Sequence, residues 1–293
     1  MPCTVCHIPT PPRTVYCPRH RRFGLLAADD QSLLAIRLAM QESWNGALDG
    51  FTCFYCGVLL DEKNPKSPDY ACFDHFVPGE KRLVLCDKRC NSMKNALTGP
   101  EFLKIIPALA DHWVSGAPFD KDIATFDKWD WKRLGLSRPM PPRKVAPFEA
   151  RIKKYTDCIV CHDVLFPKSR YCARCRRFIT AQHENAAKAA AMIDAWDPVL
   201  QGFRCRYTGV ILDEIDWRSP WYINFDHLVP GKPGLAVTSA WSNRMKGTMT
   251  EAQFRAVVPA LADHIRTGAA FEPRIVDGMQ RKAYSVRWIG DKN

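Results

Sequence analysis

The chain has 293 residues, of which 46% are apolar and 25% are charged, an ordinary composition for a globular protein that argues against disorder. No apolar run reaches the roughly 18 residues of a transmembrane helix, and the opening segment MPCTVCHIPTPPR lacks the regions of a secretion signal, so we expect a cytoplasmic protein with no membrane partner. Lysine and arginine outnumber aspartate and glutamate by 42 to 31, with a pI near 9.1, which favours a polyanionic partner such as nucleic acid.

The 13 cysteines suit metal sites better than disulfides, because their number is odd and the expected compartment is reducing. Two close pairs separated by ten residues open the chain, and the arrangement returns 155 positions later (158 − 3). The two ligand sets are Cys3, Cys6, Cys17 and His20, and then Cys158, Cys161, Cys172 and Cys175. Four such ligands on two tight turns suit a tetrahedral zinc ion. Buried free cysteines would explain neither the spacing nor the repetition, so we predict a zinc knuckle of the treble-clef or ribbon type in each half.

The knuckles belong to a longer internal repeat. A helix is predicted after each knuckle, at 30–43 and in the alanine-rich run 181–195. From Trp44 and Trp196 onward the copies run at an offset of 152 positions (196 − 44), as far as PALADH at 107–112 and 259–264. We expect the histidines that end these two segments, His112 and His264, at helix C-termini, where the helix dipole favours them.

A period this long, present twice, indicates a tandem domain duplication. The predicted units are residues 1–136 and 153–293. The segment between them, 137–152, is rich in proline and basic residues and is predicted to be a semi-stiff linker.

Only the first unit has a second complete set of paired cysteines. This set is Cys53, Cys56, Cys86 and Cys90, and its counterparts in the second unit are Cys205, Thr208, Thr238 and Ser242. One cysteine cannot hold zinc, so we predict three structural zinc ions per chain. The second unit has Trp217, Trp221 and Trp241 where the first has Pro65, Asp69 and Arg89. At about 5 kcal/mol for each buried tryptophan, an aromatic cluster could replace a zinc contribution on the order of 10–16 kcal/mol.

One seven-residue phrase occurs twice, as FDHFVPG at 73–79 and as FDHLVPG at 225–231. Residues 70–77 are predicted to form a strand that ends at a Pro-Gly turn, with a return strand at 83–85 and a helix starting at Asn91. The second unit repeats this pattern up to Asn243. A structural histidine beside a turn is the alternative for one Asp-His pair. Both units keep Asp, His and Asn at one spacing, which favours a functional role.

Together with CFYCG before it and LVLC and CNSMK after it, this segment resembles the zinc-containing members of the HNH, or ββα-metal, endonuclease family, over residues 51–104 and 203–256. The resemblance implies an α+β fold of two tandem ββα-metal units, each preceded by a zinc knuckle and a helix. It implies His75 and His227 as general bases, and a catalytic divalent cation, Mg2+ or Mn2+, bound by Asp74, Asn91, Asp226 and Asn243.

This chain departs from the family at one point. Many members have a middle Asn or His that orients the base, and here Arg82 and Gly234 lie near that place. Either a backbone group orients the histidine or the activity is reduced.

The predicted function is a metal-dependent endodeoxyribonuclease of restriction or homing type that cuts both strands of double-stranded DNA as a monomeric pseudo-dimer. The alternatives are a nicking or structure-specific nuclease with one active half, and a zinc-dependent DNA-binding protein without catalysis; RNA is the alternative substrate. Basic residues near the knuckles and hairpins are predicted to contact DNA, namely Arg19, Arg21, Arg22, Lys94, Arg174, Arg176, Arg177, Arg244 and Lys246.

Overall fold

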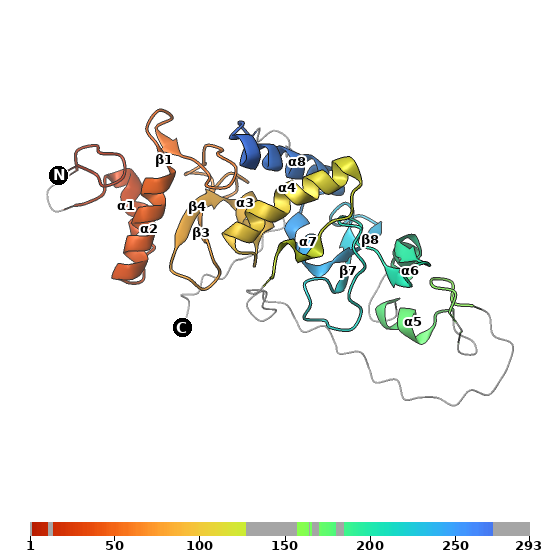
Figure 1. The fold of residues 1–293 in the computed structure, drawn as a ribbon. Coiled ribbons are helices and arrows are strands. Elements are labelled where there is room, and N and C mark those ends of the chain that lie inside the picture. Colours follow the sequence, from red (N-terminus) through yellow and green to blue (C-terminus); the bar gives the residue numbers. More distant parts are fainter. Residues whose placement is uncertain are drawn as a thin grey trace.

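The computed structural model describes residues 2–10, 14–126, 157–163, 165, 170–179 and 185–271. These residues form a mixed α+β structure in which one series of elements occurs twice, coloured red to yellow and then green to blue in Figure 1. The first series is α1 (Pro18–Gly24), α2 (Asp30–Ser43), β1 (Trp44–Asn45), β2 (Gly50–Phe51), β3 (Ala71–His75), β4 (Leu83–Asp87), α3 (Lys88–Lys94), α4 (Gly99–Ser115) and a 3-10 turn at Lys121–Ile123. The second series is α5 (Ala173–Ile179), α6 (Asn185–Ala195), β5 (Trp196–Asp197), β6 (Gly202–Phe203), β7 (Ile223–His227), β8 (Leu235–Ser239), α7 (Ala240–Lys246) and α8 (Glu251–Thr267).

Each half contains an antiparallel hairpin, β3–β4 or β7–β8, with the same register. Asp74 lies opposite Val84 in the first hairpin, and Asp226 lies opposite Ala236 in the second. Helix α2 packs on β4 and α6 on β8. The predicted helix at 30–43 is confirmed, with Asp29 as its N-cap. The second predicted helix is confirmed from residue 185, and its first four residues lie outside the described part.

The helix after each hairpin begins earlier than the sequence predicts. The Asp87 side chain accepts a hydrogen bond from the backbone N–H of Cys90 and starts α3 at Lys88, three residues before Asn91. Ser239 does the same for α7. Both helices end at a residue of positive φ, and threonine capping boxes then start α4 and α8 as separate helices.

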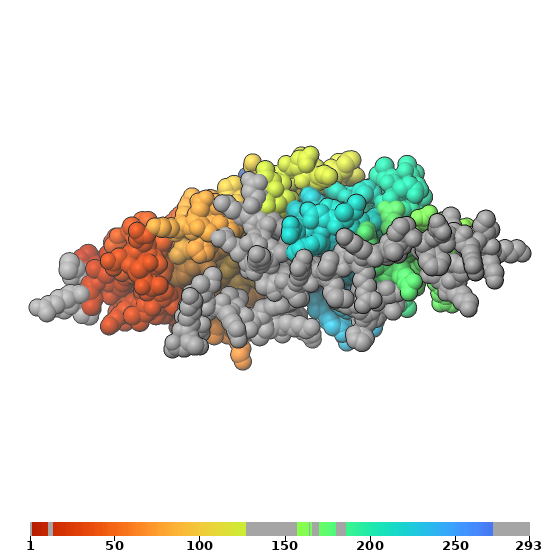
Figure 2. Space-filling model, turned by 90° about the horizontal axis from the view of Figure 1, so that it is seen from below, coloured from red at the N-terminus to blue at the C-terminus, as the bar shows by residue number. Residues whose placement is uncertain are grey.

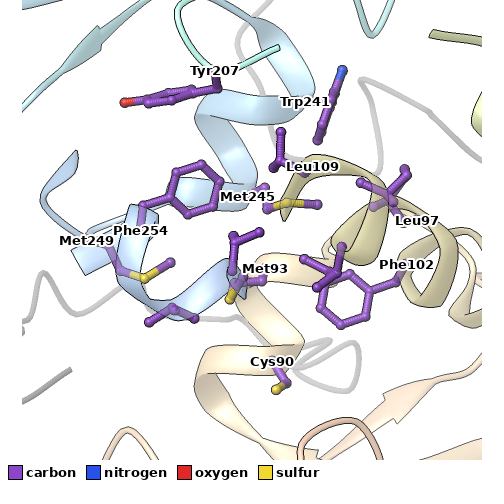
Figure 3. Close-up of a cluster of buried hydrophobic side chains, with 14 of the residues drawn as sticks. Cys90, Met93, Leu97, Phe102, Leu109, Tyr207, Trp241, Met245, Met249 and Phe254 are labelled. Atoms are coloured by element: carbon purple, nitrogen blue, oxygen red, sulfur yellow. The ribbon is translucent and has the colours of Figure 1, made fainter. Parts of the chain in front are cut away.

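The two halves share one core. Helix α4 packs along α8 and α3 packs against α7, so equivalent elements of the two halves, offset by 152 positions in the sequence, lie side by side (Figure 1). Figure 3 shows side chains of both halves around one centre, including Met93 and Leu109 of the first half and Met245 and Phe254 of the second. Seen from below, the halves lie one after the other along an elongated molecule (Figure 2).

Equivalent residues of the two halves make reciprocal contacts across this interface. The ring of His264 lies against Gly57, and the ring of His112 lies against Gly209. Each of these imidazoles bonds through Nδ1 to a carbonyl just beyond its own helix, of Ala117 or Ala269. The PALADH histidines therefore lie near the C-terminal ends of their helices, as expected, and they also dock one half on the other.

The predicted linker at 137–152 lies outside the described residues. Within the described part, no helix has both the length and the apolar character needed to cross a membrane.

The docking of His264 predicts a difference between two glycine substitutions. Gly57 and Gly116 both have φ +68°, so each change to alanine carries a left-handed cost of about 1–2 kcal/mol. A Cβ at position 57 would lie 2.6 Å from Cε1 of the anchored His264 ring, whereas a Cβ at 116 would have nothing within 4 Å. Gly57→Ala should therefore lower the free energy of unfolding by about 1–3 kcal/mol more than Gly116→Ala in denaturant titrations. Equal losses would contradict the docking.

Candidate metal centres and candidate active site

The two terminal knuckles bring their predicted ligands together. In each set of four, one ligand atom per residue lies within 4.8 Å of all the others, and seven of the eight residues are buried. In the first knuckle, Nδ1 of His20 lies 3.4 Å from Sγ of Cys3. Burial lowers the pKa of His20 to about 4, so the imidazole is neutral at pH 7 and can donate a lone pair. Both sets fit a tetrahedral zinc ion.

The third cluster corrects one predicted ligand. The structure groups Cys53, Cys56 and Cys90 with Asp87, and Cys86 lies outside the group. Neighbouring residues on a strand point to opposite faces, so on β4 only one of positions 86 and 87 can face the cluster. The Cys86 thiol instead lies 3.9 Å from the thiol of Cys72, its partner on β3. The described residues thus hold three zinc-compatible clusters, as predicted, with Asp87 in place of Cys86.

The carboxylate of Asp87 serves two purposes. One oxygen accepts the N–H of Cys90 at 2.6 Å and caps α3, while the other accepts the thiol of Cys56 at 2.9 Å. Burial, together with the neighbouring Cys53 thiolate, raises the pKa of Asp87 to about 7. A fully buried carboxylate among thiols calls for a cation, and the donor set fits zinc.

In the second half, hydroxyl groups occupy the place of this cluster. The hydroxyl of Ser239 donates to Ser242 at 2.7 Å, and the Cys205 thiol lies 3.5 Å from the Ser242 hydroxyl. Thr208 is also buried. Thr238 is the equivalent of Cys86 in the second half. Its buried hydroxyl has no hydrogen-bond partner among the described residues.

The predicted tryptophan cluster forms with two of its three members. Trp221 and Trp241 meet edge to face at 5.5 Å, and Phe119 and Phe126 of the first half pack on them. Trp217 instead stacks with the guanidinium of Arg218. The aromatic cluster therefore lies at the junction of the halves, beside the hydroxyl network that takes the place of the cysteine cluster.

Four of the six knuckle arginines predicted to contact DNA bind protein carboxylates. Arg19 and Arg22 both bond to Glu62, and Arg19 also bonds to Asp49. In the second half Arg174 and Arg177 both bond to Glu214. These pairs tie each knuckle to the hairpin unit that follows it. The remaining two, Arg21 and Arg176, are exposed on their helices.

The Asp-His hairpins contain a buried contact that the sequence did not indicate. Both oxygens of Asp74 are engaged, by the Tyr55 hydroxyl at 2.8 Å and by Nζ of Lys94 at 3.1 and 3.2 Å. Nζ of Lys94 also donates to the carbonyl of His75 at 2.9 Å. Burial raises the pKa of Asp74, while Lys94 and Tyr55 oppose the rise.

The second hairpin repeats this contact. Tyr207 donates to Asp226 at 2.6 Å, and Lys246 bonds to Asp226 at 3.0 Å and to the carbonyl of His227 at 2.9 Å. Lys94 is 0% exposed and Lys246 is 1% exposed. Neither lysine can reach a phosphate, so their prediction as DNA contacts is wrong; they join helix to strand. Arg244, the other residue of these helices predicted to contact DNA, lies half-buried near Asn95 of the first half.

The helix asparagines face the hairpin with their amide nitrogens. Nδ2 of Asn91 lies 3.5 Å from the thiol of Cys72, and Nδ2 of Asn243 donates to Oδ1 of Asn224 and to the carbonyl of Phe225. Each asparagine lies on the same helix as the buried lysine, three positions before it, and therefore on the same helix face.

The Asp-His histidines are the last residues of β3 and β7, next to the turn of each hairpin, and they point to the opposite side from the aspartates. Nδ1 of His75 bonds to the carbonyl of Glu80 at 2.6 Å, and Nδ1 of His227 bonds to the carbonyl of Lys232 at 3.0 Å. A backbone carbonyl therefore orients each ring, in the place where the sequence lacks the middle Asn or His. His75 is exposed and His227 is half-exposed.

The arrangement does not fit the predicted magnesium or manganese site. A divalent ion needs open carboxylate oxygens, but those of Asp74 and Asp226 hold a lysine and a tyrosine, and the amide nitrogens of Asn91 and Asn243 are turned toward the hairpins. In each half the aspartate lies on the hairpin and the asparagine on the helix that follows it. Their oxygens do not form an open pair that could bind a metal ion.

Sequence reasoning missed Tyr55 and Tyr207, Glu62 and Glu214, and Asp87. The tyrosines and glutamates each recur at the offset of 152 positions, so the repeat itself could have flagged them. Comparison of the chain with protein-family models, with curated proteins and with solved structures gave no match.

Zinc content distinguishes Asp87 from Cys86 as the ligand. Asp87→Asn keeps an oxygen to cap α3 but removes the anionic ligand, so it should reduce three zinc ions per chain to two. Cys86→Ala should retain all three. Mass spectrometry of metal content measures this, and a zinc lost from Cys86→Ala but kept by Asp87→Asn would restore the original assignment.

Lys94→Met should lower the free energy of unfolding by about 3–5 kcal/mol at neutral pH, because it leaves a buried carboxylate unpaired. Loss of Lys94 further raises the already raised pKa of Asp74 in the folded state. The folded variant then binds a proton more tightly than the unfolded chain, so its deficit relative to the parent protein should shrink as pH falls from neutral toward the ordinary range of Asp. Denaturant titrations at several pH values measure the deficit. Asp74→Asn/Lys94→Met is the matched control and should show no such trend; a pH-independent deficit in the single variant would refute the pairing.

Proposed function

We propose that the chain is an endonuclease that hydrolyses phosphodiester bonds in double-stranded DNA, with one reaction centre on each hairpin. The observation that carries the proposal is the pair of histidines His75 and His227, each at the end of a strand with Nδ1 bonded to a backbone carbonyl. The resemblance of both hairpins to the HNH family and the net charge of +11 support the same conclusion.

The chemistry of these histidines follows from their anchors. A carbonyl only accepts hydrogen bonds, so the neutral ring carries its hydrogen on Nδ1 and keeps a lone pair on Nε2. In His75, Nε2 has no protein partner among the described residues and the ring is exposed. Such an imidazole can take a proton from an attacking water, a step worth about 10²–10⁴ in rate.

The role of a divalent cation is a separate matter. In the family that the sequence resembles, Mg2+ or Mn2+ relieves charge on the phosphate. Here Asp74 and Asp226 hold lysines, so the proposal assigns no step to the ion.

A specific observation favours a second candidate function. With both aspartates buried in ion pairs, the hairpins are complete as structural units. The protein could then be a zinc-stabilised nucleic-acid-binding protein without catalysis, in which exposed basic residues such as Arg21 and Arg176 meet phosphates.

Plasmid cleavage tests both candidates. With two active centres, supercoiled DNA should become linear, His75→Ala and His227→Ala should each leave a nicking enzyme, and the double variant should bind without cutting. Each single variant should cut the DNA strand served by its mutated half about 10²–10⁴ times more slowly. Gel electrophoresis with and without added Mg2+ or Mn2+ measures the products and the need for a cation.

His7→Gly provides the control. His7 is exposed and lies outside the hairpins, and glycine readily adopts its positive φ. It should cut like the parent protein. Binding without cleavage under every metal condition would support the non-catalytic candidate, and a chain that neither binds nor cuts DNA would exclude both.

A further inference from the structure

The third metal cluster differs from the two knuckles in its ligands. The knuckles offer Cys3, Cys6, Cys17 and His20, or four cysteines, whereas the third cluster offers three cysteines and the carboxylate of Asp87. Thiolate and imidazole are the soft and borderline donors that hold zinc best, and a carboxylate is a harder donor. The third cluster is therefore the weakest of the three sets.

This cluster also has a charge partner that is itself buried. Three thiolates and a carboxylate outweigh the charge of Zn2+ by two. The buried guanidinium of Arg89 lies beside them, with Nε 3.8 Å from Asp87, and it pairs with Asp69 on its other side. Among the described residues, Nε and Nη1 of Arg89 have no hydrogen-bond partner, so charge rather than hydrogen bonding connects these atoms to the cluster.

The second half has replaced all of this charged set except one cysteine, since Cys205 stands in the place of Cys53. The other positions have neutral residues at the same offset of 152: Thr208 for Cys56, Ser239 for Asp87, Ser242 for Cys90, Trp241 for Arg89 and Trp221 for Asp69. If the first-half set is a metal site, its arginine should be lost together with the ligands, because a buried arginine without its anions would be costly. The cluster of the first half thus behaves as one electrostatic unit.

The same carboxylate couples this unit to α3. Asp87 caps the helix through one oxygen and faces the thiols through the other, and α3 carries Asn91 and Lys94. In the second half Ser239 caps α7 without any metal. Loss of zinc would leave buried like charges at the start of α3 and would leave α7 unchanged.

We propose that the third cluster is an exchangeable zinc site that makes the hairpin of the first half, and not that of the second, dependent on available zinc. The two halves then respond differently to one metal, whatever reaction or binding the hairpins perform. The proposal does not depend on nuclease activity.

A chelator titration of the full, zinc-loaded chain tests the proposal, with released zinc read by an indicator dye and backbone protection read by hydrogen exchange at each step. One zinc in three should leave at a chelator concentration at least about tenfold lower than the others, since even outer-shell changes shift metal affinity about 10- to 100-fold. Residues 88–94 should lose protection in that step while residues 240–246 keep theirs.

Asp87→Cys should move the early release toward the later ones, and Ser239→Cys at the equivalent position should leave the titration unchanged. The titration of the parent protein decides the matter even if Asp87→Cys fails to fold. Release of all three ions together, an early release that unprotects a knuckle helix at 18–24 or 173–179, or equal loss of protection at 88–94 and 240–246 would each overturn the proposal.

Discussion

A buried lysine joins each hairpin to the helix that follows it. Lys94 and Lys246 each neutralise an aspartate and bind the backbone carbonyl of the adjacent histidine. A lysine of this kind is tolerated in a protein interior only with its anion in place, and the anion likewise needs the lysine. The position of each histidine thus depends on an ion pair that it does not itself enter, and the retention of Asp and Lys in both halves has a structural cause. Only the histidine and the asparagine remain to be explained by function.

The two halves stabilise one architecture in two ways. The first half uses a zinc-compatible cluster of thiols and a carboxylate with an arginine beside it, and the second uses a hydroxyl network with packed indole rings. The flanking aromatics have adapted accordingly. Phe119 of the first half packs on Trp241, whereas Phe271, its equivalent, packs on the guanidinium of Arg89. Each half therefore carries a side chain fitted to the chemistry of the other.

Much of the architecture was predictable because the chain repeats itself. The duplication located the knuckles, the hairpins and the helices, and periodicity placed α2 at its observed bounds. The zinc ligands of the third cluster were predicted less well, since a Cys-x3-Cys spacing does not say which residue of a strand faces inward. The pleat of β4 turns Asp87 toward the cluster and Cys86 away from it.

Charged residues were the least predictable. The sequence does not distinguish a basic residue that faces water, as Arg21 does, from one that is buried against a carboxylate, as Lys94 is. Only tertiary packing brings Glu62 under the knuckle arginines and Tyr55 to Asp74. The packing of α4 on α8 was equally hard to predict, because an apolar helix face does not indicate which element will cover it.

That docking has a consequence for how the protein is made. The indole of Trp113 in α4 donates to the carbonyl of Tyr207 and packs on Phe254 of α8, and neither partner exists until the ribosome has translated well into the second half. A nascent first half therefore carries an uncovered apolar helix for more than a hundred codons. An apolar surface left open in this way is what makes partly folded chains prone to aggregate, so the second half serves the first as a cover during synthesis as well as in the finished fold.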